Sequence, residues 1–289
     1  MTVGAVIVAA EPPGLLPCLA KTARVEEPEI RKDVHAPRAD ERDRDGRGVL
    51  PGVRASIAWV TMVTLLLPGM DGTGRLFRRI LPLLDPALGA RVVSYPLDRT
   101  LGYGQLLHEV EVPVGPLCII AESFSGPLAV VLASRHAAQV RGLVLAASFV
   151  RSPSVLRVRM AAALGAPLFR LRLPDFALRV GMLGADATDA EVRELREALE
   201  SIQPDVLAHR LDAVARVDVT ELFASSATPT MYLAGARDRL VGVRVAKELQ
   251  RLRPEMRSHA LDAPHLVLQR APVEAAALVN AFLLPLVAS

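Results

Sequence analysis

The chain has 289 residues, of which 51% are hydrophobic and 22% are charged. This composition is typical of a globular protein and excludes a fibrous or wholly disordered one. The formal net charge is +3, and no lysine-rich block or alternation of aromatic and basic residues indicates nucleic-acid binding. The two cysteines, Cys18 and Cys118, are too few for a disulfide framework.

The first 60 residues differ in character from the rest. Residues 21–48 are charged, contain prolines and lack hydrophobic periodicity, so we interpret residues 1–58 as a disordered extension. Met62 lies at the start of the first convincing strand and is a candidate for the natural start. No run approaches the roughly 18 apolar residues of a membrane span, and the N-terminus lacks the basic region of a signal peptide. We therefore expect a cytoplasmic protein without a membrane span.

From Thr61 onward, short apolar runs alternate with helical patterns, which predicts an α/β fold with a mostly parallel sheet covered by helices on both faces. The apolar spacing at 76–84 predicts one helix, and others are expected after 121, at 242–252 and at 272–283. The predicted strands are 61–67, 91–94, 117–121, 143–147, 230–234 and 256–261.

Residues 151–225 carry only helical patterns, including a capping box at Thr188 and Glu191. We predict a helical lid over 151–227, inserted between two parts of the core at 59–150 and 228–289. Binding sites of parallel sheets lie at the carboxyl ends of the strands, so the residues that follow each strand are the functional candidates.

The third predicted strand ends in Ala121-Glu122-Ser123-Phe124-Ser125-Gly126. A serine at an abrupt strand-to-helix turn is typical of a nucleophile elbow, in which a strained backbone projects the hydroxyl above the sheet. Small residues are needed two positions before and after the serine, and Ala121 and Ser125 satisfy this. An ordinary turn rich in small residues remains the alternative.

The first predicted strand is followed by Pro68-Gly69-Met70-Asp71-Gly72-Thr73-Gly74. In a fold with a nucleophile elbow this loop supplies one amide of the oxyanion hole, and the residue after the nucleophile supplies the other. We therefore assign the backbone N–H groups of Met70 and Phe124. Phosphate binding is the alternative, but the loop lacks the spacing of nucleotide-binding motifs, and Asp71 would repel a phosphate.

The last two predicted strands are followed by Asp238 and His265. The order serine, aspartate, histidine is that of a triad on this type of sheet, with His265 as general base and Asp238 as the group that orients it. Taken alone, Asp238 is equally explained by surface pairing with Arg237 or Arg239.

The segments LLLPGMDGTGRLF, AESFSG, LAGARDRLV and APHLVLQ resemble the strand-end motifs of the α/β-hydrolase superfamily, over about residues 60–289. The PGMDGTG form resembles small bacterial esterase-like members and is similar to the oxyanion loop of phytyl-ester-synthase-type acyltransferases. Pro68 stands where many members have histidine, and Ala121 replaces the usual elbow glycine.

The motifs predict a serine hydrolase that acts on a carboxylic ester through an acyl-enzyme, without cofactor or metal. An acyltransferase that uses the same acyl-enzyme is the main alternative, and a non-catalytic binding protein is another. The apolar residues of the lid suggest a small-molecule ester with an apolar group, unless these residues only pack the lid on the core. They are Val155, Leu156, Met160, Leu164, Leu168, Phe169, Leu171, Leu173, Phe176, Leu178, Val180, Met182 and Leu183.

Overall fold

The computed structural model describes residues 62–154, 158, 163, 165–167, 169–171 and 173–287. The predicted extension at 1–58 lies outside the described residues, as does Cys18. Five of the apolar lid residues named above also lie outside them. These five are Val155, Leu156, Met160, Leu164 and Leu168.

The core is a parallel six-stranded sheet in the order β2-β1-β3-β4-β5-β6. All six predicted strands are present, which confirms the fold class expected from the sequence. Their observed bounds are β1 Val63–Leu67, β2 Ala90–Val92, β3 Leu117–Glu122, β4 Val140–Ala146, β5 Thr230–Gly235 and β6 Arg257–Leu261.

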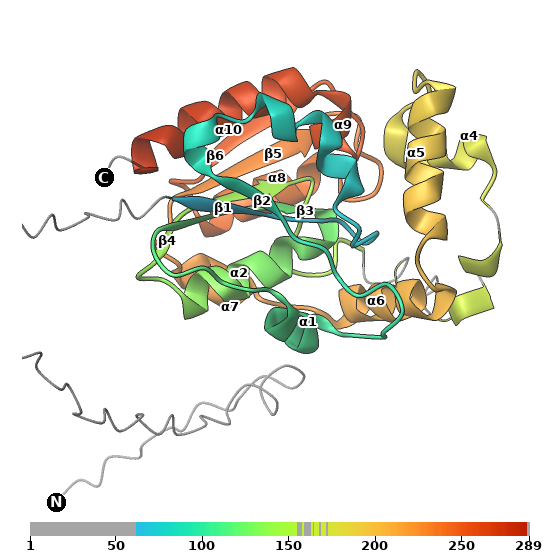
Figure 1. Cartoon of the computed structure of the whole chain (residues 1–289), viewed down its shortest axis with the longest axis horizontal. Coiled ribbons are helices and arrows are strands. Elements are labelled where there is room, and N and C mark those ends of the chain that lie inside the picture. The colour runs from blue at the N-terminus through green and yellow to red at the C-terminus, as the bar shows by residue number, and fades with distance from the viewer. Residues whose placement is uncertain are drawn as a thin grey trace, which may run out of the picture.

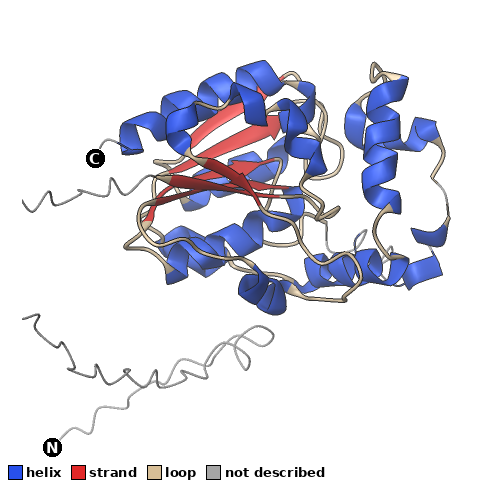
Figure 2. Cartoon of the chain, in the orientation of Figure 1, coloured by secondary structure: helices blue, strands red, loops and turns tan. Residues whose placement is uncertain are grey.

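Helices cover both faces of the sheet (Figure 2). Because side chains alternate along a strand, Leu65 and Leu67 pack into one core while Leu66 packs into the other. The first core contains residues of α1 (Tyr103–Glu109), α2 (Gly126–Arg135), α7 (Thr220–Ser225) and α8 (Val243–Leu252). The second contains residues of α9 (Val267–Arg270) and α10 (Pro272–Val287). Among the described helices, none is long and apolar enough to cross a membrane.

The single helix predicted over 76–84 is wrong, and α1 was not predicted. The chain instead forms three short 3₁₀ helices, η1 (Arg75–Arg79), η2 (Leu81–Leu83) and η3 (Pro86–Leu88). Pro82 and Pro86 lack the amide donors that a longer helix needs, and each disfavours helical geometry in the residue before it. The apolar spacing still buries Phe77, Ile80 and Leu84 against the sheet.

The segment between β4 and β5 is helical, as predicted, and we call it the helical insertion. Its α5 and α6 lie beyond the carboxyl ends of the strands (Figure 1). The predicted capping box is confirmed, since the Thr188 N–H donates to Glu191 Oε2 at 2.7 Å and Thr188 Oγ1 accepts from the Glu191 N–H at 3.3 Å. Among its described residues, the insertion contains α4 (Asp175–Leu178), η5 (Arg179–Leu183), α5 (Asp189–Glu200), α6 (Pro204–Arg216) and α7.

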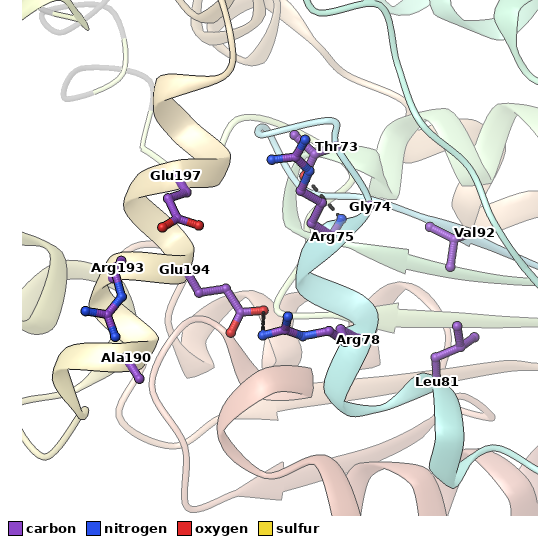
Figure 3. A pocket seen from close by; sticks show the side chains of 10 residues that line it. All are labelled: Thr73, Gly74, Arg75, Arg78, Leu81, Val92, Ala190, Arg193, Glu194 and Glu197. Carbon is purple, nitrogen blue, oxygen red and sulfur yellow. Dashed lines mark hydrogen bonds and ion pairs between the residues drawn. The ribbon is translucent and has the colours of Figure 1, made fainter.

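Helix α5 is attached to the core by ion pairs at its first turns. Glu191, which is buried, accepts hydrogen bonds from Arg79 of η1, at 2.6 Å, and from Arg270 of α9. One turn along α5, Glu194 pairs with Arg78 at 3.1 Å (Figure 3). Burial opposes ionisation of Glu191, but the hydrogen bonds from Thr188 and Arg270 outweigh it and lower its pKa to about 2. The ionised carboxylate therefore holds α5 in place.

We predict that Glu191→Gln destabilises the protein by about 1–3 kcal/mol at neutral pH, because it leaves two arginines without their shared carboxylate. A carboxylate with a lower pKa in the folded state than in the unfolded state stabilises the fold when the pH is above its unfolded-state pKa. This stabilisation is lost as the pH falls through the folded-state pKa. The difference in free energy of unfolding between wild type and Glu191→Gln should therefore decrease as the pH is lowered from about 5 toward about 2. Urea denaturation at several pH values measures this difference.

Glu197→Gln is the matched control, since Glu197 is exposed on the same helix. A Glu197→Gln variant as unstable as Glu191→Gln would contradict the assignment of this anchoring role to Glu191.

Candidate active site

Ser123 lies where β3 ends and a 3₁₀ turn, η4 (Ser123–Ser125), leads into α2. Its φ angle is 48°, in the left-handed region that residues with a Cβ rarely adopt. This confirms the strained backbone expected of the elbow. The strain lifts the hydroxyl off the end of the strand and turns it toward the loops that follow the neighbouring strands.

Contacts with the end of β4 hold the elbow in this conformation. The Ser148 hydroxyl donates to the backbone carbonyl of Ser123 at 2.6 Å. A Cβ added at Gly126 would lie 1.9 Å from Ser148 Oγ, so only glycine allows α2 to approach β4 here. Ala121, two residues before the serine, is fully buried, in agreement with the requirement for a small side chain.

The structure brings Ser123, His265 and Asp238 together, although they are far apart in the sequence. Ser123 Oγ lies 2.9 Å from His265 Nε2, and His265 Nδ1 lies 2.9 Å from Asp238 Oδ2. The side chains of His265 and Asp238 are only 3% and 2% exposed. The three groups thus form one hydrogen-bonded chain that is largely shielded from water.

Asp238 does not make the surface pairs considered from the sequence, since Arg237 pairs instead with Asp186 and Asp262. Burial opposes its ionisation, but hydrogen bonds from His265 and from the amides of Leu240 and Val241 hold its pKa below the ordinary range. Those amides donate to Oδ1 at 2.8 Å and 3.1 Å, which leaves Oδ2 for the imidazole. The carboxylate is thereby charged and fixed in orientation.

The loop after β1 forms a tight turn beside the elbow. The Gly72 N–H donates to the Gly69 carbonyl at 3.0 Å, and Gly72 has a φ of 69°. Within the described residues, no protein acceptor is recorded for the Met70 N–H. The Phe124 N–H lies in the first turn of η4, where amides have no acceptor within their own helix. The two amides assigned from the sequence are therefore available to a bound anion.

A cavity of about 770 Å³ opens over Ser123 and His265. Apolar side chains from the helical insertion form much of its wall, and Met70 and Leu266 contribute from the core. The insertion's apolar contributors are Phe169, Leu171, Leu173, Leu178, Met182, Leu195, Leu199, Ile202 and Leu207. Leu171 and Leu173 are exposed, so part of this apolar wall does not pack on the core.

A separate cleft of about 560 Å³ lies between η1 and α5 (Figure 3). Its lining includes Arg75, Arg78, Arg193, Glu194 and Glu197. Neither Ser123 nor His265 reaches it, so we assign the chemistry to the apolar cavity.

Two buried ionisable residues near the site were missed in the sequence analysis. Glu122 directly precedes the nucleophile candidate and is 1% exposed, and Arg210 on α6 is also 1% exposed. The sequence pattern contained a signal for each of them. Glu122 ends an apolar strand, and Arg210 lies at helical spacing from Val206, Ala213 and Val214, on the apolar face of α6.

The Glu122 carboxyl is held in a poor environment for a charge. It accepts one hydrogen bond, from Gln269 Nε2 at 3.1 Å, while its Oε1 has no partner among the described residues. Burial, together with the nearby Asp71 carboxylate, raises the pKa of Glu122 to about 8. The group is therefore a neutral acid at pH 7, and it lines the same cavity as Ser123.

No established protein-family profile matches the chain. A pimeloyl-[acyl-carrier protein] methyl ester esterase of Xanthomonas axonopodis pv. citri is 30% identical over 200 residues, which cover 61% of this chain and 77% of that protein.

Solved structures share the fold at lower identity. A thermophilic esterase of Thermogutta terrifontis aligns with a TM-score of 0.63 and 18% identity over 78% of this chain and 90% of its own. A hydrolase of Pseudomonas aeruginosa gives the same TM-score at 19% identity, over 78% of this chain and 91% of its own. At these identities the likeness bears on the fold alone.

We predict that Glu122→Gln stabilises the protein relative to wild type as the pH rises. The folded wild type keeps a proton that the unfolded chain releases, so its relative stability falls between the unfolded pKa, about 4.3, and the folded value. The difference in free energy of unfolding between Glu122→Gln and wild type should grow from about pH 5 and level off above about pH 8. Since one unit of pKa shift corresponds to about 1.4 kcal/mol, the difference should reach a few kcal/mol at most. Urea denaturation across this range measures it.

Glu111→Gln serves as the control because Glu111 is exposed, and its profile should run parallel to wild type. A Glu122→Gln profile that also runs parallel to wild type would mean that the Glu122 carboxyl is not held neutral.

Proposed function

This chain belongs to the α/β-hydrolases and is an esterase, and on that premise we propose that it cleaves its ester with a Ser123–His265–Asp238 triad through an acyl-enzyme. The observation that carries the proposal is the buried hydrogen-bonded chain that joins the three side chains at the floor of an apolar cavity. A serine hydroxyl becomes an effective nucleophile when an adjacent base removes its proton. His265 Nε2 is within reach to do so.

In the proposed reaction, Ser123 Oγ attacks the ester carbonyl as its proton passes to His265 Nε2. Asp238 accepts a hydrogen bond from Nδ1–H, fixes that tautomer and stabilises the imidazolium. The tetrahedral oxyanion is bound by the amides of Met70 and Phe124, each worth about 3 kcal/mol in enzymes of this kind. The imidazolium then protonates the departing alcohol, and water, activated by the same base, releases the acid from the acyl-enzyme.

We propose that the substrate carries an apolar group, which the helical insertion covers as a lid. The cavity wall supports this, since residues of α5, α6 and the segment before α4 face the same space as Ser123. The Xanthomonas relative is named for a methyl ester borne on an acyl chain attached to an acyl-carrier protein. This similarity favours an ester of a small alcohol with an aliphatic acid.

Ser123→Ala should lower kcat by roughly 10⁴-fold or more on p-nitrophenyl esters of short and medium acyl chains, because the variant has no nucleophile. Asp238→Asn should lower kcat by about 10⁴-fold while the fold is kept, because the wrong imidazole tautomer is favoured. Steady-state kinetics give both values, and a fluorophosphonate should label wild type at Ser123.

Full esterase activity in Ser123→Ala would overturn the mechanism. Product analysis with an added alcohol distinguishes an esterase, which releases the free acid, from an acyltransferase, which makes a new ester.

Leu199 is half-buried on α5 and lines the cavity, so Leu199→Trp should fill part of it. The variant should lower kcat/KM for medium-chain esters by about 10-fold or more, as expected when an apolar group loses its pocket, and leave acetyl esters nearly unaffected. Steady-state kinetics on p-nitrophenyl esters of different acyl chain lengths measure kcat/KM for each chain length.

Leu222→Trp is the control, because Leu222 is exposed on α7 and does not line the cavity. An equal effect of Leu199→Trp on acetyl and medium-chain esters would argue against an acyl group in this part of the cavity.

A further inference from the structure

Arg210 carries a charge from α6 of the insertion into the interior and ends at the loop after β1. It is among the largest fully buried side chains, with 1% exposed. Its Nη1 donates to the carbonyls of Met70, at 2.7 Å, and Asp71, at 3.1 Å. Its Nη2 donates to the Pro96 carbonyl at 2.8 Å. An arginine of the insertion thus contacts the carbonyls of the two central residues of the Gly69–Gly72 turn.

Every carbonyl of this turn has a hydrogen-bond donor, and Arg210 supplies two of the four. The Gly69 carbonyl accepts from the Gly72 N–H, and the Gly72 carbonyl accepts from the Tyr95 N–H at 2.7 Å. The Met70 N–H belongs to the same peptide plane as the Gly69 carbonyl and points the opposite way. The bond between the Gly69 carbonyl and the Gly72 N–H therefore fixes the direction of the Met70 N–H, for which no protein acceptor is recorded within the described residues.

The guanidinium packs so closely on the turn that no side chain fits between them. A Cβ added at Gly72 would lie 2.4 Å from Arg210 Nη1. The guanidinium also lies over the Tyr95 ring, 5.7 Å from its centroid. The Tyr95 hydroxyl is hydrogen-bonded to Ser125 Oγ at 2.6 Å, and Ser125 Oγ donates to the Pro68 carbonyl. Arg210 therefore joins the insertion, the turn and the elbow.

Arg210 makes no direct ion pair with a described residue, although the Asp71 carboxylate interacts with it electrostatically at longer range. Its three recorded acceptors are backbone carbonyls, which carry only partial charge, and its Nε has no partner among the described residues. Charged groups are seldom buried unless they are compensated. A methionine or leucine would fill the space without that penalty, but it could not hold two carbonyls in fixed directions.

We propose that Arg210 is a positioning residue that sets the Gly69–Gly72 turn so that the Met70 amide faces the developing oxyanion. This inference rests on the oxyanion hole of the proposed function. It makes helix α6 a part of the apparatus that stabilises the transition state, in addition to its place in the cavity wall. Loss of Arg210 should accordingly lower kcat and leave KM almost unchanged, since the turn acts on the transition state and not on the bound ester.

The test uses the full chain with Arg210→Met and Arg210→Lys. We expect kcat to fall by about 10²-fold in Arg210→Met, the usual effect of losing one oxyanion donor, with KM within about 3-fold of wild type. Arg210→Lys keeps the charge but lacks the planar fork that spans several acceptors, so its kcat should also fall. Active sites are counted by the end-point of fluorophosphonate labelling, so that kcat refers to folded enzyme only.

Arg253 provides a matched control. It is 2% exposed, donates to the Thr228 carbonyl and to Thr230 Oγ1, and lies 5.5 Å from the centroid of the Phe223 ring. Thr228 and Thr230 lie at the amino end of β5, the opposite end from the site. Arg253→Met should lower the melting temperature without changing kcat per labelled site.

The outcomes separate the two proposals. Wild-type kcat per labelled site in both Arg210 variants would overturn the role of Arg210, as would an equal fall of kcat in Arg253→Met. If Arg210→Met does not fold, a wild-type kcat per labelled site in Arg210→Lys is enough to overturn the positioning role of Arg210. Absence of fluorophosphonate labelling at Ser123 in wild type would instead overturn the proposed function.

Discussion

The site depends on one strained residue. Ser123 has a positive φ at the end of β3, a conformation that costs on the order of 1–3 kcal/mol and persists only where its surroundings hold it. Residues that follow both neighbouring strands, β4 and β1, hold Ser123 in this conformation. Ser148, after β4, donates to the Ser123 carbonyl, and Ser125 ties the start of α2 to the Pro68 carbonyl after β1. The neighbouring strands thereby fix the direction of the hydroxyl, and the parallel sheet brings His265 and Asp238 to the same edge.

The helical insertion contributes to this edge in two physically different ways. Helix α5 is held from outside by the ion pairs of Glu191 and Glu194 with η1 and α9. Helix α6 is held from inside by Arg210, which bonds to backbone carbonyls of the turn after β1. The first attachment keeps an apolar wall above the serine. The second makes the geometry of that turn depend on a distant part of the chain, since Arg210 and Met70 are 140 residues apart in the sequence.

The sequence predicted the layers of the fold well because apolar runs and strand-end motifs are local signals. The six strands and the convergence of Ser123, Asp238 and His265 follow from chain order and from the rule that parallel strands end at one edge. The helix predicted over 76–84 failed because Pro82 and Pro86 prevent it while the apolar spacing stays the same. Helix α1 was missed, although Tyr103, Leu106 and Leu107 bury one side of it. The contact between Arg210 and the turn could not be predicted from spacing alone, because it joins elements whose relative placement only the folded chain supplies.

An acidic and a basic side chain are buried at this edge, and the protein accommodates them by opposite means. Glu122 is buried beside Asp71 with one hydrogen bond, and it keeps its proton, since a second negative charge there would be poorly compensated. Arg210 cannot lose its proton at physiological pH, so the chain supplies three carbonyls and the ring of Tyr95 around it. A neutral Glu122 together with a charged Arg210 leaves the edge more favourable to negative charge than two ionised groups would. This electrostatic balance would favour the oxyanion that the proposed mechanism forms beside Ser123.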